Sequence, residues 1–88
     1  MMEPVFRKKF LNEYELAERR GKDMVKIKDL MKDLIEEKLL PPQNRDHPLF
    51  GDYTGYRECH IEPDWLIIYK RDKPFIIFYR TGTHSDLF

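Results

Sequence analysis

GYRECHIEPDWLIIYKRDKPFIIFYRT, residues 55–81, decides the fold of this chain. It contains three strand-length runs, residues 55–61, 65–71 and 75–81, separated by the turn sequences EPDW and RDKP. Runs rich in Ile, Tyr, Phe and Trp that are bounded by proline and aspartate are typical of β-hairpins. The continuous apolar segments LIIY and FIIF indicate central strands that other elements cover. This stretch therefore predicts three consecutive strands of one sheet.

The first half of the chain predicts one short strand and two helices. PVFRK, residues 4–8, reads as a strand, and apolar residues at helical spacing predict a helix from about residue 8 to Arg20, ended by Gly21. Asp23 is placed to cap a second helix. The apolar stripe of that helix consists of Ile27, Leu30, Met31, Leu34 and Ile35. Because the link is so short, we expect an antiparallel helical hairpin, followed by a loop and a short strand within PLFGDY.

These elements predict a single domain that spans residues 1–88. Their order is β-α-α-β-β-β-β, an α+β fold with the two-helix hairpin packed on one face of the sheet. A chain of this length buries roughly 60% of its unfolded surface, which is enough for one modest core.

Composition narrows the class of protein. No apolar run is long enough to span a bilayer and no signal peptide is recognisable, so we expect a cytoplasmic protein without membrane association. The single cysteine, Cys59, excludes an internal disulfide and a thiolate zinc site. The 16 basic and 16 acidic residues balance, which argues mildly against nucleic-acid binding. Local basic clusters at residues 7–9 and 70–73 are the exceptions.

Reactive side chains gather near the ends of the predicted strands. Strand alternation places Glu58 and His60 on one face and the core-like residues Cys59 and Ile61 on the other. Glu58 and His60 should therefore face away from the helices, towards an exposed side of the sheet. The other polar or aromatic residues at or near strand ends are His47, Asp64, Trp65, Arg80, His84 and Phe88.

Each of these residues also has an ordinary structural explanation. A single exposed histidine is usually only a surface residue, Asp64 after Pro63 is a common turn former, and Trp65 is more often packing than binding. Their joint occurrence around one small sheet favours a site, for which two chemistries remain open. Imidazoles and carboxylates can bind a transition metal, although no closely spaced histidine pair supports it. Alternatively, histidines act as general base and acid while an arginine counters phosphate charge.

Two stretches, DHPLFGDYTGYRECHIEPDWLIIYKRD (residues 46–72) and FYRTGTHSDLF (residues 78–88), resemble the YafQ-type toxins of the RelE/ParE superfamily. The resemblance covers about the last half of the chain, and the two preceding helices agree in order and length. It implies a fold like that of microbial RNases, with two helices on one side of a curved, mainly antiparallel sheet. It also implies a toxin of a type II toxin–antitoxin pair that cleaves mRNA in the ribosomal A site.

The same resemblance implies partners and site residues. The partners would be mRNA, the ribosome and a DinJ-like antitoxin, with operator DNA bound only through the antitoxin complex. The family motifs match catalytic residues at His47, His60, Asp64, Arg80 and His84. They match substrate-binding residues at Glu58, Trp65 and Phe88. The resemblance implies no metal and no other cofactor.

Cleavage of RNA by its own 2′-hydroxyl needs a base, an acid and a cation at the phosphate. We assign His84 as the general acid. Either His60, or His47 with Asp64 tuning its charge, takes the 2′-hydroxyl proton. Arg80 stabilises the phosphate, and Phe88 and Trp65 are expected to stack on or wedge an mRNA base.

Other functions remain open at this stage. Ribosome-dependent members of the superfamily tend to be basic, whereas this chain is neutral, so cleavage of free RNA is an alternative. A non-catalytic module that binds its antitoxin and operator DNA is a second. The third is a small metal-dependent hydrolase that uses His47, His60, His84 and Asp64.

Overall fold

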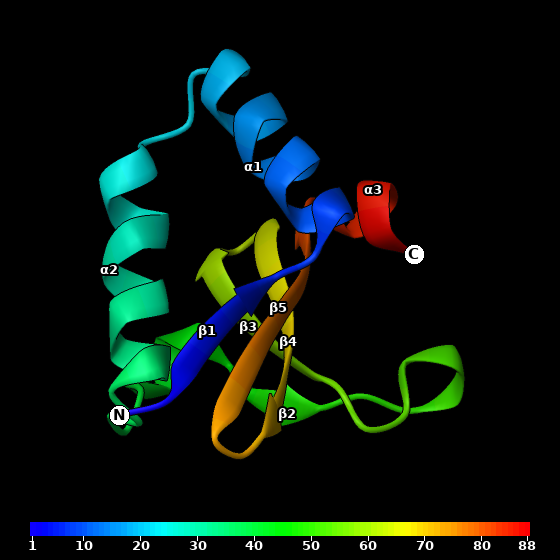
Figure 1. Ribbon diagram of the computed structural model, residues 1–88. Helices are drawn as coiled ribbons and strands as arrows, with labels where there is room; N and C mark the ends of the chain where they lie inside the picture. The colour runs from blue at the N-terminus through cyan, green and yellow to red at the C-terminus, as the bar shows by residue number, and fades with distance from the viewer.

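The computed structural model describes residues 1–88 (Figure 1). Strand β1 (Glu3–Phe6) precedes helices α1 (Lys8–Arg19) and α2 (Met24–Ile35). The remaining strands are β2 (His47–Pro48), β3 (Arg57–Glu62), β4 (Trp65–Asp72) and β5 (Phe75–Gly82). Short 3₁₀ turns η1 (Pro42–Asn44) and η2 (Gly51–Tyr53) flank β2, and helix α3 (His84–Leu87) follows β5. None of these helices has the length and apolar character needed to cross a membrane.

The strands form one mixed sheet in the order β1-β5-β4-β3-β2. β1 runs parallel to β5, and all other neighbours are antiparallel. Two-residue turns at Pro63–Asp64 and Lys73–Pro74 join the three long strands, as the turn sequences predict. The predicted α+β fold and its element order are therefore confirmed. The strand expected within PLFGDY is shorter, because Gly51 adopts a φ of 68° and turns the chain into η2.

The helices begin and end close to the predicted residues. Gly21 follows α1 with a φ of 81°, a left-handed conformation that favours glycine. Asp23 caps α2 by accepting a hydrogen bond of 3.1 Å from the Val25 N–H. The two helices diverge from their link, so that α1 packs on β5 and α2 on β3 (Figure 1). The pair is thus more open than a closely packed hairpin.

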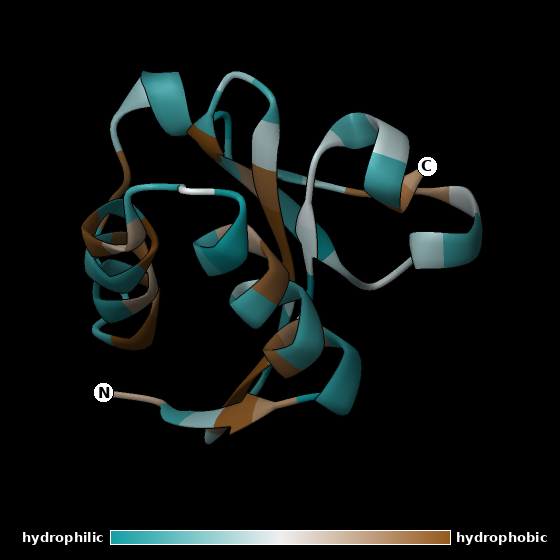
Figure 2. Cartoon of the chain, turned by 90° about the horizontal axis from the view of Figure 1, so that it is seen from above, coloured by the Kyte–Doolittle hydropathy of each residue, from teal (hydrophilic) through white to brown (hydrophobic).

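Both faces of the sheet are covered, which explains the continuous apolar strands. Alternate residues of β4 point to opposite sides, so Ile67 joins the large core under α1 and α2 while Leu66 and Ile68 do not. Leu66 and Ile68 pack instead with Leu87 of α3 in a smaller cluster. Figure 2 shows the hydrophobic strands at the centre of the molecule. The sequence predicts the layer formed by α1 and α2 on one face of the sheet. It does not predict α3, which partly covers the opposite face.

A β-bulge in the β4–β5 ladder changes where one functional side chain points. Ile68 pairs with Arg80 and Tyr69 pairs with Phe78, which leaves Tyr79 as the extra residue. The register therefore places Arg80 on the same side of the sheet as Ile68, the side that α3 covers. Simple alternation from Phe78 would put Arg80 under α1 instead.

Candidate active site

Three histidines from three segments surround one buried carboxylate on the face of the sheet opposite α1 and α2. The carboxylate belongs to Glu58 of β3, which is only 5% exposed. Its Oε2 lies 3.2 Å from Nε2 of His47 in β2. Its Oε1 lies 3.3 Å from Nε2 of His60 in β3 and 3.8 Å from Nε2 of His84 in α3. The sequence correctly predicts that Glu58 and His60 face away from the helices. The expectation of an exposed face is wrong, because Glu58 and His60 are only 5% and 6% exposed, with the imidazoles of His47 and His84 beside them.

The other nitrogen of each imidazole faces an oxygen acceptor. Nδ1 of His47 contacts the Arg45 carbonyl, and Nδ1 of His60 lies 3.2 Å from the carbonyl of Pro63. Nδ1 of His84 lies 2.8 Å from Oδ1 of Asp64. Carbonyl and carboxylate oxygens only accept hydrogen bonds, so these partners assign the N–H of each ring to Nδ1. Three Nε2 atoms therefore converge on the carboxylate of Glu58.

This convergence brings three imidazoles, each of which can carry a proton, against one carboxylate. A neutral imidazole with its hydrogen on Nδ1 turns a lone pair on Nε2 towards the lone pairs of Glu58. The arrangement becomes favourable when a proton sits between a ring and the carboxylate, which then stabilises the resulting imidazolium. Histidine gains and loses protons near neutral pH, so the cluster has the properties of a general acid–base centre.

Exposure separates the histidines into two groups. The side chains of His47 and His84 are 47% and 51% exposed, whereas that of His60 is only 7% exposed. The Asn44 side chain also donates a hydrogen bond of 2.7 Å to the backbone carbonyl of His60, which fixes the strand. A substrate therefore reaches His47 and His84 directly, while His60 lies behind them.

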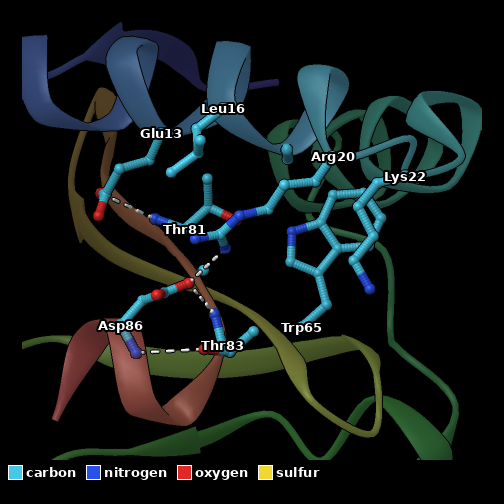
Figure 3. Close-up of a pocket in the computed structure, with 10 residues that line it drawn as sticks. Glu13, Leu16, Arg20, Lys22, Trp65, Thr81, Thr83 and Asp86 are labelled. Carbon is cyan, nitrogen blue, oxygen red and sulfur yellow. Dashed lines mark hydrogen bonds and ion pairs between the residues drawn. The ribbon is translucent and has the colours of Figure 1, made fainter.

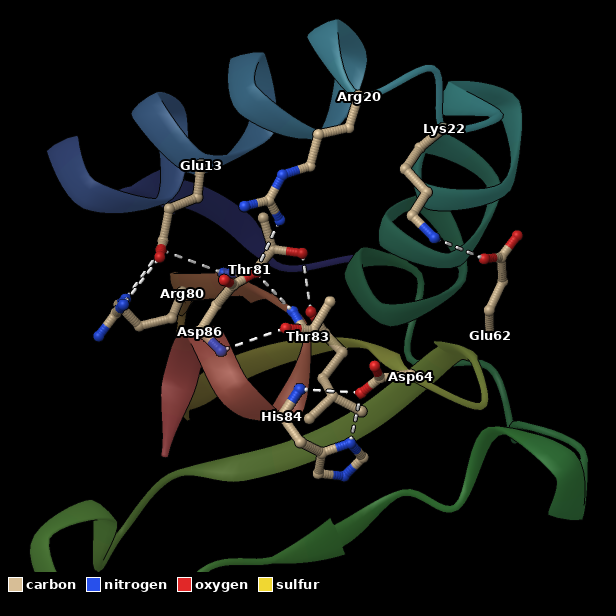
Figure 4. A network of polar contacts seen from close by, with 11 residues as sticks. Glu13, Arg20, Lys22, Glu62, Asp64, Arg80, Thr81, Thr83, His84 and Asp86 are labelled. Atoms are coloured by element: carbon tan, nitrogen blue, oxygen red, sulfur yellow. Dashed lines mark hydrogen bonds and ion pairs between the residues drawn. The ribbon is translucent and has the colours of Figure 1, made fainter.

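Asp64 positions His84 rather than His47. Its Oδ1 accepts hydrogen bonds from the backbone N–H of His84, at 2.9 Å, and from the imidazole (Figure 4). These bonds hold the pKa of the Asp64 carboxyl below its usual value. The prediction that Asp64 tunes His47 is therefore wrong. The β3–β4 turn places Asp64 opposite the start of α3, whereas β2 carries His47 to another side of the cluster.

A separate pair of contacts fixes the segment that carries His47. Asp46, the preceding residue, accepts hydrogen bonds from the Arg57 guanidinium at 3.1 Å and from the Tyr69 hydroxyl at 2.6 Å. β2 has only two residues in the sheet, so its ladder bonds alone hold it weakly. The Asp46 contacts tie this short strand to β3 and β4, and so hold His47 in register with Glu58.

Helix α3 is short but is fixed at its start by a capping box. The Thr83 hydroxyl accepts a hydrogen bond from the Asp86 N–H, and the Asp86 carboxylate accepts one from the Thr83 N–H. The same carboxylate lies 2.8 Å from Nη1 of Arg20, just after α1 (Figure 4). The signal T-x-x-D at residues 83–86 could have revealed this helix from the sequence.

The Arg20–Asp86 pair predicts a measurable pH dependence of stability. The Arg20 guanidinium, followed by the Thr83 N–H, lowers the pKa of Asp86 to about 2. A carboxyl whose pKa is lower in the folded state stabilises the fold above its unfolded value of about 3.9. That contribution is lost as the pH falls towards the folded value.

Replacing Asp86 by asparagine is therefore expected to lower the free energy of unfolding by about 1 kcal/mol at pH 7, through the cap and the exposed ion pair together. The difference between wild type and variant should shrink between pH 4 and pH 2. Thermal unfolding midpoints across this range measure it. Asp29→Asn, at an exposed position of α2 without an ion-pair partner, is the matched control. An Asp86→Asn difference that is constant with pH would contradict the assignment.

Arg80 forms no hydrogen bond or ion pair with the histidine cluster. Its Nε and Nη2 bind the two carboxylate oxygens of Glu13 in α1, at 2.8 and 2.7 Å (Figure 4). The hydrogen bonds to Glu13 raise the pKa of Arg80. Nη1 forms no hydrogen bond within the chain. Glu13 thus binds Nε and Nη2 of the guanidinium. Only Nη1 remains for the expected contact with a phosphate. Glu13 has no sequence pattern that marks this role.

The structure contradicts the prediction that Trp65 stacks on RNA. Trp65 is 1% exposed and belongs to the large core. Its ring lines a small pocket of about 180 Å³ between α1 and the sheet, with the Lys22 ammonium 5.6 Å from the ring centre (Figure 3). Alternation explains the error, since the first residue of β4 points to the helical face, away from the histidines.

Phe88, in contrast, is 62% exposed and lies beside the cluster. Its ring centre is 6.4 Å from that of His84 and 5.5 Å from that of Tyr53. The position is compatible with the predicted contact to a base, because an exposed ring is available for stacking. Tyr53 was not among the residues singled out from the sequence.

The same cluster has the donors of a transition-metal site. One ligand atom each from Glu58, His60 and His84 lie within 4.8 Å of one another. Imidazole nitrogens with one carboxylate oxygen suit Zn²⁺, Cu²⁺ or Ni²⁺ rather than Mg²⁺ or Ca²⁺. Because these are the atoms that face Glu58, a proton and a metal ion would compete for the same place.

Comparisons with known proteins identify the family. The family model described as "Bacterial toxin of type II toxin-antitoxin system, YafQ" matches residues 2–88. The "mRNA interferase toxin YafQ" of Escherichia coli K12 is 49% identical over 80 residues, 90% of this chain and 87% of that protein.

Solved structures agree with this result. The toxin chain in a crystal structure of the E. coli DinJ–YafQ complex superimposes with a TM-score of 0.93 at 43% identity, covering 100% of this chain and 99% of that chain. A copper-bound mutant toxin from Helicobacter pylori gives a TM-score of 0.95 at 32% identity, with full coverage of both chains. The chain therefore belongs to the YafQ family of bacterial type II toxin–antitoxin toxins.

Proposed function

We propose that this toxin is an endoribonuclease that cleaves mRNA by metal-independent acid–base catalysis. The observation that carries the proposal is the convergence of three imidazole Nε2 atoms on the buried Glu58 carboxylate. Two of the three imidazoles are open to a substrate, which supplies one base and one acid. The E. coli relative is named as an mRNA interferase, which supports mRNA as the substrate.

The roles follow from exposure and partners. His47 takes the proton of the 2′-hydroxyl, because it is exposed and its Nε2 lies beside a carboxylate that stabilises the imidazolium formed. The 2′-oxygen attacks the adjacent phosphorus, and the bond from phosphorus to the 5′-oxygen breaks. His84, held by Asp64 at Nδ1, enters the reaction as an imidazolium and gives its Nε2 proton to that 5′-oxygen. The products are a 2′,3′-cyclic phosphate and a 5′-hydroxyl.

His60 and Arg80 have supporting roles in this proposed reaction. His60 is buried against Glu58 and fixes the position of this side chain without reaching the RNA. Arg80 is assigned the stabilisation of charge on the phosphate oxygens, through Nη1, which has no partner within the chain. Its other nitrogens are fixed by Glu13, so the guanidinium does not need to be reoriented during the reaction.

Two partners belong to the same proposal. The DinJ–YafQ complex of E. coli supports a DinJ-like antitoxin as the partner that neutralises this toxin. We further propose that cleavage takes place in the A site of the ribosome. The local basic clusters at residues 7–9 and 70–73 would then contact ribosomal RNA, since the net charge of the chain is zero.

Primer extension on one defined mRNA tests the proposal. Wild-type protein and His84→Ala are compared in a purified translation system and on the same mRNA without ribosomes. Cuts at in-frame positions that need ribosomes and disappear in the variant are expected. Cuts without ribosomes would replace the A-site proposal by cleavage of free RNA. The absence of cuts under both conditions would contradict the proposed enzymatic activity and would favour a module that only binds its antitoxin.

A second candidate function for the same atoms is metal binding. The donor set of Glu58, His60 and His84 and the copper-bound H. pylori relative favour it. A metal ion bound there would either act as a Lewis acid in a hydrolase or block the Nε2 atoms that the proposed acid–base reaction uses. The effect of added metal on cleavage separates the two possibilities.

Added Cu²⁺ is expected to inhibit cleavage, because it takes the Nε2 lone pairs on which the acid–base exchange depends. Isothermal titration should show one ion bound per chain, and Glu58→Gln should weaken that binding about 10-fold or more. Toxin that is stripped with EDTA and then freed of the chelator before the assay should cleave at the rate of the untreated protein. A rate that falls after this treatment and returns when the toxin is reloaded with a transition metal would instead support the metal-dependent hydrolase.

A further inference from the structure

A hollow of about 640 Å³ lies beside the histidine cluster, within the range of about 300–1,000 Å³ that is typical of small-ligand sites. The six lining residues that matter here are Lys9, Phe50, Tyr53, Tyr79, Arg80 and Phe88. The proposed cleavage gives no role to Phe50, Tyr53 or Tyr79. We refer to these six residues and the space between them as the aromatic groove.

Tyr53 is the fixed centre of the aromatic groove. Its ring centre lies 5.5 Å from that of Phe88 and 6.2 Å from that of Tyr79, edge to face in both cases. Its hydroxyl donates a hydrogen bond of 3.1 Å to the carbonyl of Leu87. The ring centre of Tyr79 in turn lies 4.8 Å from that of Tyr56, the residue before β3. The rings therefore form a continuous surface that rests on the smaller core.

Two rings of the groove are turned towards solvent. Phe50 is 82% exposed and Phe88 is 62% exposed. Neither ring is needed to complete the core, and both line the same hollow. Exposed aromatic side chains that gather around one hollow are typical of a binding surface rather than of packing. Between them, a flat ring of a ligand can lie against Tyr53.

The charges of the groove suit a nucleotide. Lys9, at the start of α1, is a cation of the groove without an ion pair, and Asp52 is the one carboxylate among the lining residues. Arg80 is ion-paired with Glu13 through Nε and Nη2, which leaves Nη1 without a partner within the chain. Aromatic faces for bases together with nearby cations for phosphates are the usual features of single-strand binding sites. A purely apolar peptide segment would leave the Lys9 ammonium and Nη1 of Arg80 without partners.

We propose that the aromatic groove binds the base of the nucleotide on the 3′ side of the scissile phosphate. This inference rests on the proposed function, in which His84 protonates the 5′-oxygen of that nucleotide. The ring of His84 is 6.4 Å from Phe88, where the groove begins. The leaving nucleotide therefore starts beside His84, and its base extends over Phe88 towards Tyr53 and Phe50.

The test is the rate of single-turnover cleavage on programmed ribosomes, with toxin below saturation. The mRNA carries either a normal or an abasic nucleotide directly 3′ of the mapped cut, which leaves the attacking 2′-hydroxyl in place. Phe50→Leu removes the aromatic face but keeps apolar bulk, and Phe50→Trp restores a ring. Leu39→Ala, at a fully exposed position that does not line the groove, is the control.

The abasic mRNA should be cut about 10-fold more slowly by the wild type, and Phe50→Leu should lose a similar factor on normal mRNA. The two changes together should cost no more than either alone, because they remove the same contact. Phe50→Trp and Leu39→Ala should cut at the wild-type rate.

Four results would overturn the proposed role of the aromatic groove. Equal rates on both mRNAs, or additive losses in Phe50→Leu, would show that this base does not lie on Phe50 although the enzyme cuts. Weaker antitoxin binding by Phe50→Leu, with cleavage unchanged, would assign the surface to a protein partner. A wild-type protein that cuts no RNA would remove the proposed function itself and the groove with it.

Discussion

Glu58→Gln is expected to reduce the rate of mRNA cleavage by about 100-fold or more, because one carboxylate serves all three imidazoles. The glutamine keeps the shape of the side chain, and its amide N–H can donate to an Nε2 lone pair. It lacks the negative charge that stabilises an imidazolium at His47 or His84. Acid and base are therefore weakened together.

The thermal stability of Glu58→Gln, unlike its activity, should not fall below that of the wild type. Glu58 is buried, and a buried charge has a desolvation cost that a neutral amide avoids. We expect thermal unfolding of Glu58→Gln at or above the wild-type midpoint. Glu62→Gln is the matched control on the same strand, since Glu62 pairs with Lys22 and Lys26 on the helical side. A fully active Glu58→Gln would contradict the central role of the carboxylate.

His84→Gln is expected to lower the cleavage rate by about 10²–10⁴-fold, the usual contribution of a general acid. The side chain is 51% exposed and packs little, so the variant should fold normally. The loss of rate alone does not show whether His84 acts as an acid or as a base. A substrate with a sulfur leaving group distinguishes the two roles, because sulfur leaves as a thiolate without needing a proton.

An mRNA with a bridging 5′-sulfur at the cut site therefore separates the two roles. On this substrate His84→Gln should be cut at close to the wild-type rate. His47→Gln should remain slow, because the 2′-hydroxyl still requires a base. Rescue of His47→Gln and not of His84→Gln would exchange the two assignments.

Much of the fold follows from local sequence signals. Pro63–Asp64 and Lys73–Pro74 mark the two turns, and the apolar stripe of Ile27, Leu30 and Leu34 marks α2. These signals are short in range, so a single sequence contains them. The bulge at Tyr79 and the divergence of the helices depend on packing between distant segments, which local patterns do not record.

The candidate site was predictable as a set of residues but less so as a geometry. Alternation in β3 correctly placed Glu58 and His60 on one face. It could not show that Asp64 binds His84, because that contact joins a turn to a helix 20 residues later. Trp65 was misplaced for a similar reason, since its burial depends on α1 and α2 rather than on its neighbours in β4.

The most direct test of this mechanism is the chemistry of the cut itself, with toxin stripped of metal by EDTA and then freed of the chelator, on ribosome-bound mRNA with a single 2′-deoxy nucleotide 5′ of the scissile phosphate. The deoxy mRNA is expected to stay intact. The all-ribose mRNA is expected to yield a 2′,3′-cyclic phosphate and a 5′-hydroxyl. Cleavage of the deoxy mRNA at the normal rate, or a 5′-phosphate on the product, would show that the imidazole–carboxylate cluster does not act through the 2′-hydroxyl.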